Sequence, residues 1–280
     1  MIPRPVAYLA AGLVAWTLAG APPAVAQLYP PLPARYALSP GARDIRAAWV
    51  NPAGLALDRE ASIGADATVD RTTEHLRVAQ YGASLQSANL AFAWSHSRYP
   101  GGLGANAYVL AIGLGDEALS AGVARRWFRG GRNTGAWDLA LRARASASAD
   151  LSLVWRMIGS PWVRDSVLRR WPAGIVPGAG LRLLGGRLQA AAETELRTDL
   201  GGVREVRFGA TVMPLRSLSI TVRGDLSPGF SRRGFAVAVT WWQAGSRVAV
   251  ASIMPSSGVS VDAIGASGSI VAIPPGRGSR

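Results

Sequence analysis

The sequence contains no cysteine and no lysine, and both absences limit what the chain can do. Without cysteine, disulfide bonds and thiolate metal sites are excluded. The formal net charge of +13 comes entirely from arginine. These arginines are scattered through turns and segment ends and are not collected in one basic helix, so they predict no nucleic-acid partner. Arginines at a membrane interface would instead face anionic lipid headgroups.

Motifs of enzyme chemistry are also lacking. The two histidines, His75 and His96, have no second histidine or group of carboxylates at metal-ligand spacing. No G-x-S-x-G nucleophile motif occurs, and the glycine-rich stretches lie between predicted strands, where a phosphate loop would need a following helix. Glu193 and Glu195 share a strand face, but carboxylates beside arginines more often form a polar wall network than an acid–base pair. The sequence therefore predicts no enzyme activity, no cofactor and no metal site.

The first residues have the composition of a secretory signal peptide. Arg4 precedes an apolar run from Val6 to Ala19, and residues 24–26 read Ala-Val-Ala, an A-x-A cleavage site. The run is shorter than the roughly 20 residues that span a bilayer. We therefore predict export with cleavage after Ala26; an uncleaved anchor is the alternative.

Alternation of apolar and polar residues with period two dominates the rest of the chain. The segments from Ala61 to Ala272 number about fourteen, which is in the range of transmembrane barrels. Charged residues recur on the polar faces, whereas the apolar faces are rich in alanine and valine. A soluble β-sandwich also alternates, but its inner face gathers large aliphatic side chains. We therefore predict an all-β fold, a transmembrane antiparallel β-barrel of about 14 strands, or 12, in the bacterial outer membrane.

The same alternation predicts the direction of individual side chains. Those expected to face lipid are Leu139, Leu141, Val206, Phe208, Ile220 and Val222. Charged side chains expected to face the lumen, and to pair there because unpaired buried charges are costly, are Arg142, Arg144, Glu193, Glu195, Arg207, Arg223 and Asp225. Fragments of an apolar stripe on the lumen side are expected at Val109, Ala111, Val154, Ile158, Ala236 and Ala238.

One connection, residues 159–178, differs from the others. Ser160-Pro161 would start a helix and Pro172 would end it, with apolar residues at helical spacing between them. We predict a short amphipathic helix in the headgroup region or over the barrel mouth, or else a plain helical turn in a long extracellular loop.

A compact apolar segment, residues 46–57, precedes the first predicted strand. Asn51-Pro52 breaks any helix that starts at Arg46, and Gly54 permits close contact with a wall. The stretch NPAGLA, from Asn51 to Ala56, resembles the N-terminal signature of the FadL family of outer-membrane channels for fatty acids and hydrocarbons. The related PorV-like proteins of type IX secretion have a similar segment.

This resemblance implies a fourteen-stranded barrel whose lumen is closed by an N-terminal hatch. It also implies passive uptake of small hydrophobic or amphiphilic molecules, with outer-membrane lipid and a hydrophobic small-molecule ligand as partners. The PorV likeness implies the alternative, a non-transporting barrel that anchors or shuttles exported proteins. The expected hatch residues are Trp49, Asn51, Pro52, Ala53, Gly54 and Leu55.

Four parts of the chain follow from these interpretations. Residues 1–26 are the expected signal peptide, and residues 27–58 the expected N-terminal extension and hatch. Residues 59–273 are the expected barrel, and the Gly/Ser/Arg-rich residues 274–280 a flexible tail. The chain is short for a FadL-type channel, and it lacks the terminal aromatic residue that usually ends bacterial outer-membrane barrels.

Overall fold

A computed structural model describes residues 32–58, 60–71, 76–99, 103–130, 134–164, 168–243, 246–255 and 263–272. The predicted signal peptide, the predicted tail and His75 lie outside these residues. In the described part of the chain, no helix is long and apolar enough to cross a membrane.

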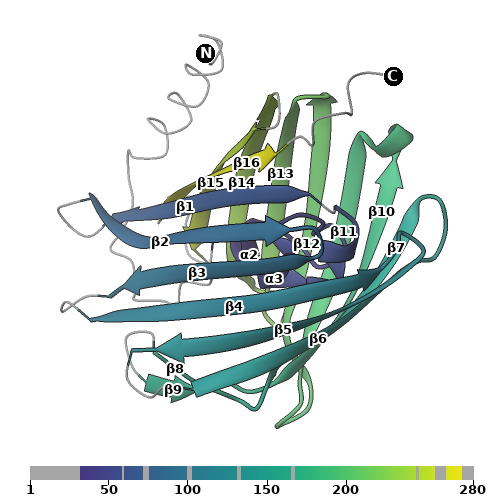
Figure 1. Cartoon of the computed structure of the whole chain (residues 1–280). Helices are drawn as coiled ribbons and strands as arrows, with labels where there is room; N and C mark the ends of the chain where they lie inside the picture. The colour runs from purple at the N-terminus through teal and green to yellow at the C-terminus, as the bar shows by residue number, and fades with distance from the viewer. Residues whose placement is uncertain are drawn as a thin grey trace.

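Fourteen strands form one closed antiparallel barrel, which confirms the predicted fold class (Figure 1). Neighbours in sequence are neighbours in the sheet, except that β7 pairs with β10, and β1 closes the barrel against β16. A closed sheet has no edge, so its backbone N–H and C=O groups pair internally. The strands are β1 (Ala61–Arg71), β2 (Leu76–Ser87), β3 (Leu90–Arg98), β4 (Gly104–Gly115), β5 (Leu119–Arg129), β6 (Thr134–Arg144), β7 (Ala149–Ile158), β10 (Gly174–Leu183), β11 (Leu188–Arg197), β12 (Val203–Leu215), β13 (Leu218–Leu226), β14 (Arg232–Gln243), β15 (Ser246–Pro255) and β16 (Ala263–Ala272).

The connection between β7 and β10 carries a small hairpin of its own. β8 (Trp162–Arg164) and β9 (Leu168–Arg170) form a two-stranded sheet, so the helix predicted within residues 159–178 is wrong. The N–H of Trp171 donates to the carbonyl of Pro161 at 2.8 Å across the base of this hairpin. Aromatic and β-branched residues favour such extended pairing, and Trp162 and Val163 supply both types in β8.

The two ends of the barrel differ in the length of their connections. At one end, which we call the short-turn end, two to four residues join successive strands, and one of these turns contains η3 (Leu184–Gly186). At the opposite loop end the connections have four to seven residues, apart from residues 159–173. Because the number of strands is even, β1 begins and β16 ends at the short-turn end. Short turns at one end and longer loops at the other are typical of outer-membrane barrels.

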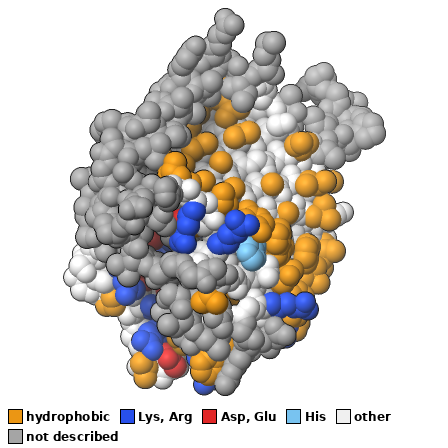
Figure 2. All heavy atoms as spheres, turned by 90° about the vertical axis from the view of Figure 1, so that its left-hand side faces the viewer, with side chains coloured by type: hydrophobic (Ala, Val, Ile, Leu, Met, Phe, Trp, Pro, Cys, Tyr) orange, Lys and Arg blue, Asp and Glu red, His pale blue; other side chains and the backbone are white. Residues whose placement is uncertain are grey.

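The outer wall of the barrel is apolar. The predicted outward residues Leu139, Leu141, Phe208, Ile220 and Val222 are between 36% and 51% exposed, and Val206 is half-buried. Figure 2 faces the loop end and shows hydrophobic side chains over the visible outer wall, with several arginines near the centre of the view and at its lower edge.

Five of the six expected fragments of an inner apolar stripe face inward. Each of them is at most 4% exposed: Val109, Ala111, Val154, Ala236 and Ala238. The expectation for Ile158 is wrong, because Ile158 lies opposite Trp137, whose side chain is 47% exposed on the outer wall. Met157, with φ of 55°, interrupts the alternation just before Ile158.

The outward position of Leu141 predicts a cost for charge on this wall. Leu141→Arg, near the middle of the barrel wall, should destabilise the protein in lipid vesicles by about 2–4 kcal/mol. The control is Ser87→Arg, since exposed Ser87 ends β2 beside a turn and a charge near the interface costs only about 0–1 kcal/mol. Urea unfolding followed by heat-modifiable gel mobility measures both values, and equal stability of the two variants would contradict the assignment.

Candidate functional site

The described residues ahead of β1 fold inside the barrel, and we call residues 32–58 the hatch (Figure 1). It contains α2 (Pro33–Tyr36), α3 (Ala47–Val50) and η1 (Pro52–Ala56). α3 and η1 contact β3 to β6, while α2 contacts β13 and β14 on the other side. All six residues expected in a hatch are buried in this segment: Trp49, Asn51, Pro52, Ala53, Gly54 and Leu55.

Asn51 shapes the hatch from within. Its side-chain Oδ1 accepts a hydrogen bond from the N–H of Ala53 at 3.1 Å, and its Nδ2 donates to the carbonyl of Ser39 at 3.0 Å. The residue is fully buried and lies between α3 and η1, with Pro52 at the first position of η1. Removing the amide would leave a buried donor and acceptor unpaired, at about 1–3 kcal/mol each. Asn51 therefore fixes the turn between the two short helices.

The hatch packs on a group of small apolar residues in the wall of β3, β4 and β5. We call these the apolar wall patch: Ala91, Ala93, Val109, Ala111 and Ala124. Trp49, Val50 and Leu55 of the hatch form one buried cluster with this patch. Large hatch side chains thus meet small wall side chains, which leaves room for the hatch in the lumen.

Two glycines of the wall let the hatch backbone approach further. Gly113 of β4 and Gly122 of β5 lie opposite each other beneath η1. A Cβ on Gly122 would lie 2.3 Å from the nitrogen of Ala53, and one on Gly113 would lie 2.7 Å from the nitrogen of Ala56. Any larger residue would overlap with the hatch backbone, so these two glycines belong to the site although the sequence offered no signal for them.

Wall arginines donate to the end of α3. Arg126 Nη2 donates to the carbonyl of Trp49 at 3.0 Å, while its Nε donates to Asp138 at 2.7 Å. Arg156 Nη2 donates to the carbonyl of Val50 at 2.6 Å. The last carbonyls of a helix have no partner within it, so these guanidinium groups satisfy them. Sequence analysis missed both arginines, because a contact to a backbone carbonyl leaves no side-chain pattern.

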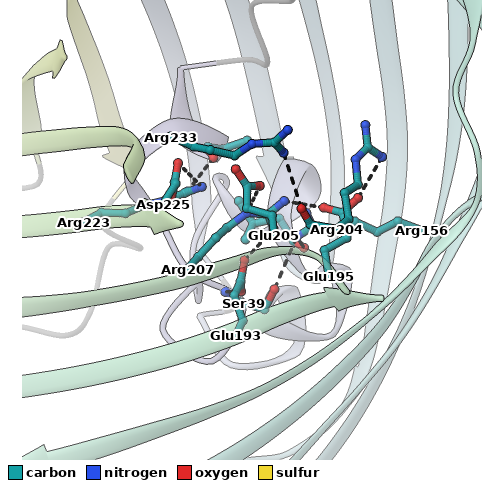
Figure 3. A network of polar contacts seen from close by, with 12 residues as sticks. Ser39, Arg156, Glu193, Glu195, Arg204, Glu205, Arg207, Arg223, Asp225 and Arg233 are labelled. Atoms are coloured by element: carbon teal, nitrogen blue, oxygen red, sulfur yellow. Dashed lines mark hydrogen bonds and ion pairs between the residues drawn. The ribbon is translucent and has the colours of Figure 1, made fainter. Parts of the chain in front are cut away.

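A network of charged residues on β11 and β12 faces the hatch from the opposite wall (Figure 3). The N–H of Ser39 donates to Glu193 Oε2 at 2.7 Å. Arg207 donates to Glu193 at 2.9 Å and to Glu205 at 2.8 Å, and it also pairs with Glu195. Glu193, Glu195 and Arg207 are all less than 9% exposed. The structure thus brings together three of the predicted lumen charges and joins them to the hatch backbone.

Arg223 and Asp225 form a pair on β13 at 2.7 Å. Arg223 also donates to the hatch carbonyls of Ala34 at 2.7 Å and Ala37 at 3.1 Å. Two strands along the wall, on β15, Arg247 pairs with Asp44 of the hatch. Polar contacts therefore hold the hatch on the walls of β13 and β15 as well.

The remaining two predicted lumen charges lie at the short-turn end, away from the Glu193 network. Arg142 is 1% exposed and donates to Asp150 at 2.6 Å. Arg144 is at the rim, where its side chain is 25% exposed and pairs with Glu117 in the turn after β4. Asp150 was not predicted, although its place on the inner face of β7 follows the same alternation.

The described residues contain no group of three or more potential metal ligands. A pocket of about 190 Å³ at the loop end is lined by Arg170, Trp171, Pro172, Arg197 and Arg204. Arg204 lies over the ring of Trp171 at 4.8 Å. This pocket is cationic, because three of its five lining residues are arginines.

Comparison with known proteins gives likeness in structure only. No protein-family model matches the sequence. No curated protein matches it either. The structure is similar to that of the toluene transporter TodX of Pseudomonas putida, with 12% identity, a TM-score of 0.51, and coverage of 89% of this chain and 98% of that one.

Two further solved structures give similar values. The CymD monoaromatic hydrocarbon channel has 8% identity and a TM-score of 0.51 over 82% of this chain and 94% of that chain. A FadL homologue of Pseudomonas aeruginosa has 10% identity and a TM-score of 0.50 over 88% of this chain and 99% of that chain. The chain therefore has a barrel fold similar to that of FadL-type channels.

The contact at Gly122 predicts the effect of a single methyl group. Gly122→Ala should leave the barrel closed but displace η1, because overpacking costs about 1–3 kcal/mol. Trypsin should then cleave after Arg43 and Arg46 of the hatch about 5- to 150-fold faster, in proportion to the displaced population. Gly268→Ala is the control, since the nearest atom to its Cβ would be 3.8 Å away. Equal protection of the hatch in both variants would show that the contact does not hold it.

Asp58, at the end of the hatch, predicts a dependence on pH. Burial, together with the negative charges of Asp44 and Glu60, raises the pKa of Asp58 from 3.8 to about 6. The folded state therefore binds this proton more tightly than the unfolded state, and the stability that the protonated group contributes is lost as pH rises from 3.8 to about 6.

Asp58→Asn should accordingly reduce the fall in stability across this range. Urea unfolding midpoints at several pH values, compared with those of the parent, measure the difference. Asp199→Asn is the control, because hydrogen bonds from Arg197 lower the pKa of exposed Asp199 to about 2. A parent and an Asp58→Asn variant with the same pH profile would contradict the assignment.

Proposed function

We propose that this protein is an outer-membrane channel for passive uptake of small hydrophobic or amphiphilic molecules, and that the hatch is its gate. The observation that carries the proposal is the contact between Trp49, Val50 and Leu55 and the apolar wall patch. Much of the remaining lumen surface near the hatch carries charged groups. An apolar strip along one wall is the surface that a hydrophobic molecule would follow through such a lumen.

The placement of the hatch contacts supports a gate that moves to one side. Hydrogen bonds and ion pairs hold the hatch to β7, β11, β13 and β15 through Arg156, Glu193, Arg223 and Arg247. Toward β3 and β4 its contacts are apolar and nondirectional. A small shift of η1 and α3 away from these two strands would uncover the apolar wall patch, while the polar contacts on the far wall stayed in place. In this movement Arg126 on β5 would release the carbonyl of Trp49, while Arg156 on β7 would have to follow the carbonyl of Val50.

Location in the outer membrane is part of the same proposal. It is supported by the predicted export signal, by the apolar outer wall and by a fold similar to that of FadL-type channels. Membrane lipid is then the partner of the outer wall, and a hydrophobic small molecule is the ligand. A hydrocarbon carries no charge, so the protein would need no titratable group to bind it. The proposal accordingly assigns no enzyme activity.

The test compares two probes in liposomes, a fluorescent fatty acid and a polar dye. Deleting residues 46–57 should raise the leak of both probes, because it removes α3 and η1 from the lumen. Asn51→Ala should change fatty-acid uptake selectively, by about 5- to 150-fold if the loss of its hydrogen bonds destabilises the closed hatch by about 1–3 kcal/mol. Thr198→Ala is the control, because the hydroxyl of Thr198 donates a hydrogen bond to the carbonyl of Ala173 in an exposed connection at the loop end.

A different result would favour the alternative, a barrel that anchors or shuttles exported proteins. If the deletion and Asn51→Ala leave both probes unaffected in barrels that still fold, the hatch does not gate the lumen and channel function is wrong.

A further inference from the structure

Four guanidinium groups converge on one carboxylate at the short-turn end. Asp150 lies 2.6 Å from Arg142, 3.3 Å from Arg182, and 3.9 Å from both Arg43 and Arg144. Arg142 and Arg144 come from the end of β6, Asp150 from the start of β7 and Arg182 from the end of β10. Arg43 belongs to the hatch. The cluster therefore joins three wall strands to the hatch.

The charges of this cluster do not balance. Among the described residues, the carboxylates that pair with these four arginines are Asp150 and Glu117. Like charges held close together in a partly desolvated site repel one another. Asp58 also acts electrostatically on Arg43, which leaves at least one positive charge in excess and makes this part of the lumen attractive to an anion.

Several hydrogen-bond donors of the cluster are also buried without an acceptor. They include Nε and Nη1 of Arg142, Nε of Arg144 and Nε of Arg182. The hydroxyl of Ser152, which lies opposite Arg142 across the β6–β7 pair, is buried without a partner as well. Buried donors without acceptors are unfavourable. A ligand with several oxygen atoms would supply the acceptors that these donors lack.

The depth of the cluster suits a ligand that enters from the short-turn end. The Arg142 side chain is 0% exposed at the bottom, whereas those of Arg43, Arg144 and Arg182 are 29%, 25% and 20% exposed. A small anion can thus reach the outer three arginines from solvent and contact Arg142 within. Glu117 and Asp150 accept hydrogen bonds from only some of the N–H groups of these arginines.

We propose that this cluster binds a small oxyanion, namely a phosphate or carboxylate group, at the short-turn end of the barrel. Guanidinium groups present paired N–H donors that match the oxygens of such groups. Because Arg43 is on the hatch and the other arginines are on the wall, a bound oxyanion bridges the two. Binding therefore holds the hatch more firmly against β6 and β10.

The test uses full-length protein folded in detergent and needs no transport assay, so it is independent of channel function. Its unfolding temperature is measured by heat-modifiable gel mobility at pH 7 with sodium phosphate, sodium acetate or sodium chloride at equal ionic strength. A ligand present at several times its Kd should raise the unfolding temperature by about 2–4 °C above the chloride value. A rise with phosphate alone or with acetate alone identifies the oxyanion, and both results support the site.

Arg142→Gln and Arg182→Gln should each abolish this rise. The second variant guards against misfolding of the first, because the Arg182 side chain is 20% exposed whereas that of Arg142 is fully buried. Arg197→Gln, which removes an exposed arginine paired with Asp199 near the loop end, should keep the full rise. The proposal is wrong if neither oxyanion raises the unfolding temperature of the parent beyond chloride, or if both cluster variants respond as the parent does.

Discussion

Hydrogen bonds between β1 and β16 join the first strand of the sheet to the last, and the other features of the molecule depend on that closure. A closed sheet has one face outside and one face around a confined lumen, so each alternating residue belongs to one or the other. Outside, the apolar residues need no further partner in lipid. Inside, charged residues must find partners at short range, and the space that they leave must be filled. The hatch fills it, and its own backbone supplies many of those partners.

The hatch is held largely through its main chain. Arg126, Arg156 and Arg223 donate to its carbonyls, and Gly113 and Gly122 touch its backbone directly. Such contacts constrain the path of the hatch more than the identity of its side chains. The hatch side chains can then be apolar and pack on the apolar wall patch. For this reason an apolar contact lies inside a lumen that also carries charged groups. In the cationic cluster around Asp150 this pairing is left incomplete.

Much of this architecture follows from local patterns, and the rest does not. The alternation of apolar and polar residues predicted the strands and the outward direction of Leu141 and Phe208. It did so because one face of each strand lies outside the barrel and the other faces the lumen along the whole length of the strand. The prediction of a helix in residues 159–178 was wrong, because a short stretch of mixed apolar residues fits both the helical period and the strand period. Pairing between β8 and β9 stabilises the extended conformation there. Contacts between arginines and hatch carbonyls join residues about 75 to 190 positions apart. No periodic signal in a single sequence reports such contacts.

The distribution of hatch contacts around the barrel has a consequence for the order of assembly. Gln86 on β2, Arg126 on β5, Glu193 on β11 and Arg247 on β15 all contact the hatch, so its partners surround it on every side. They stand in these positions together only after the sheet has closed. The hatch, although it precedes β1 in the chain, therefore completes its folding last. Until then the hatch has partners on only part of its circumference, and a chaperone that holds the unfolded chain would have to cover the apolar hatch residues whose wall strands have not yet paired.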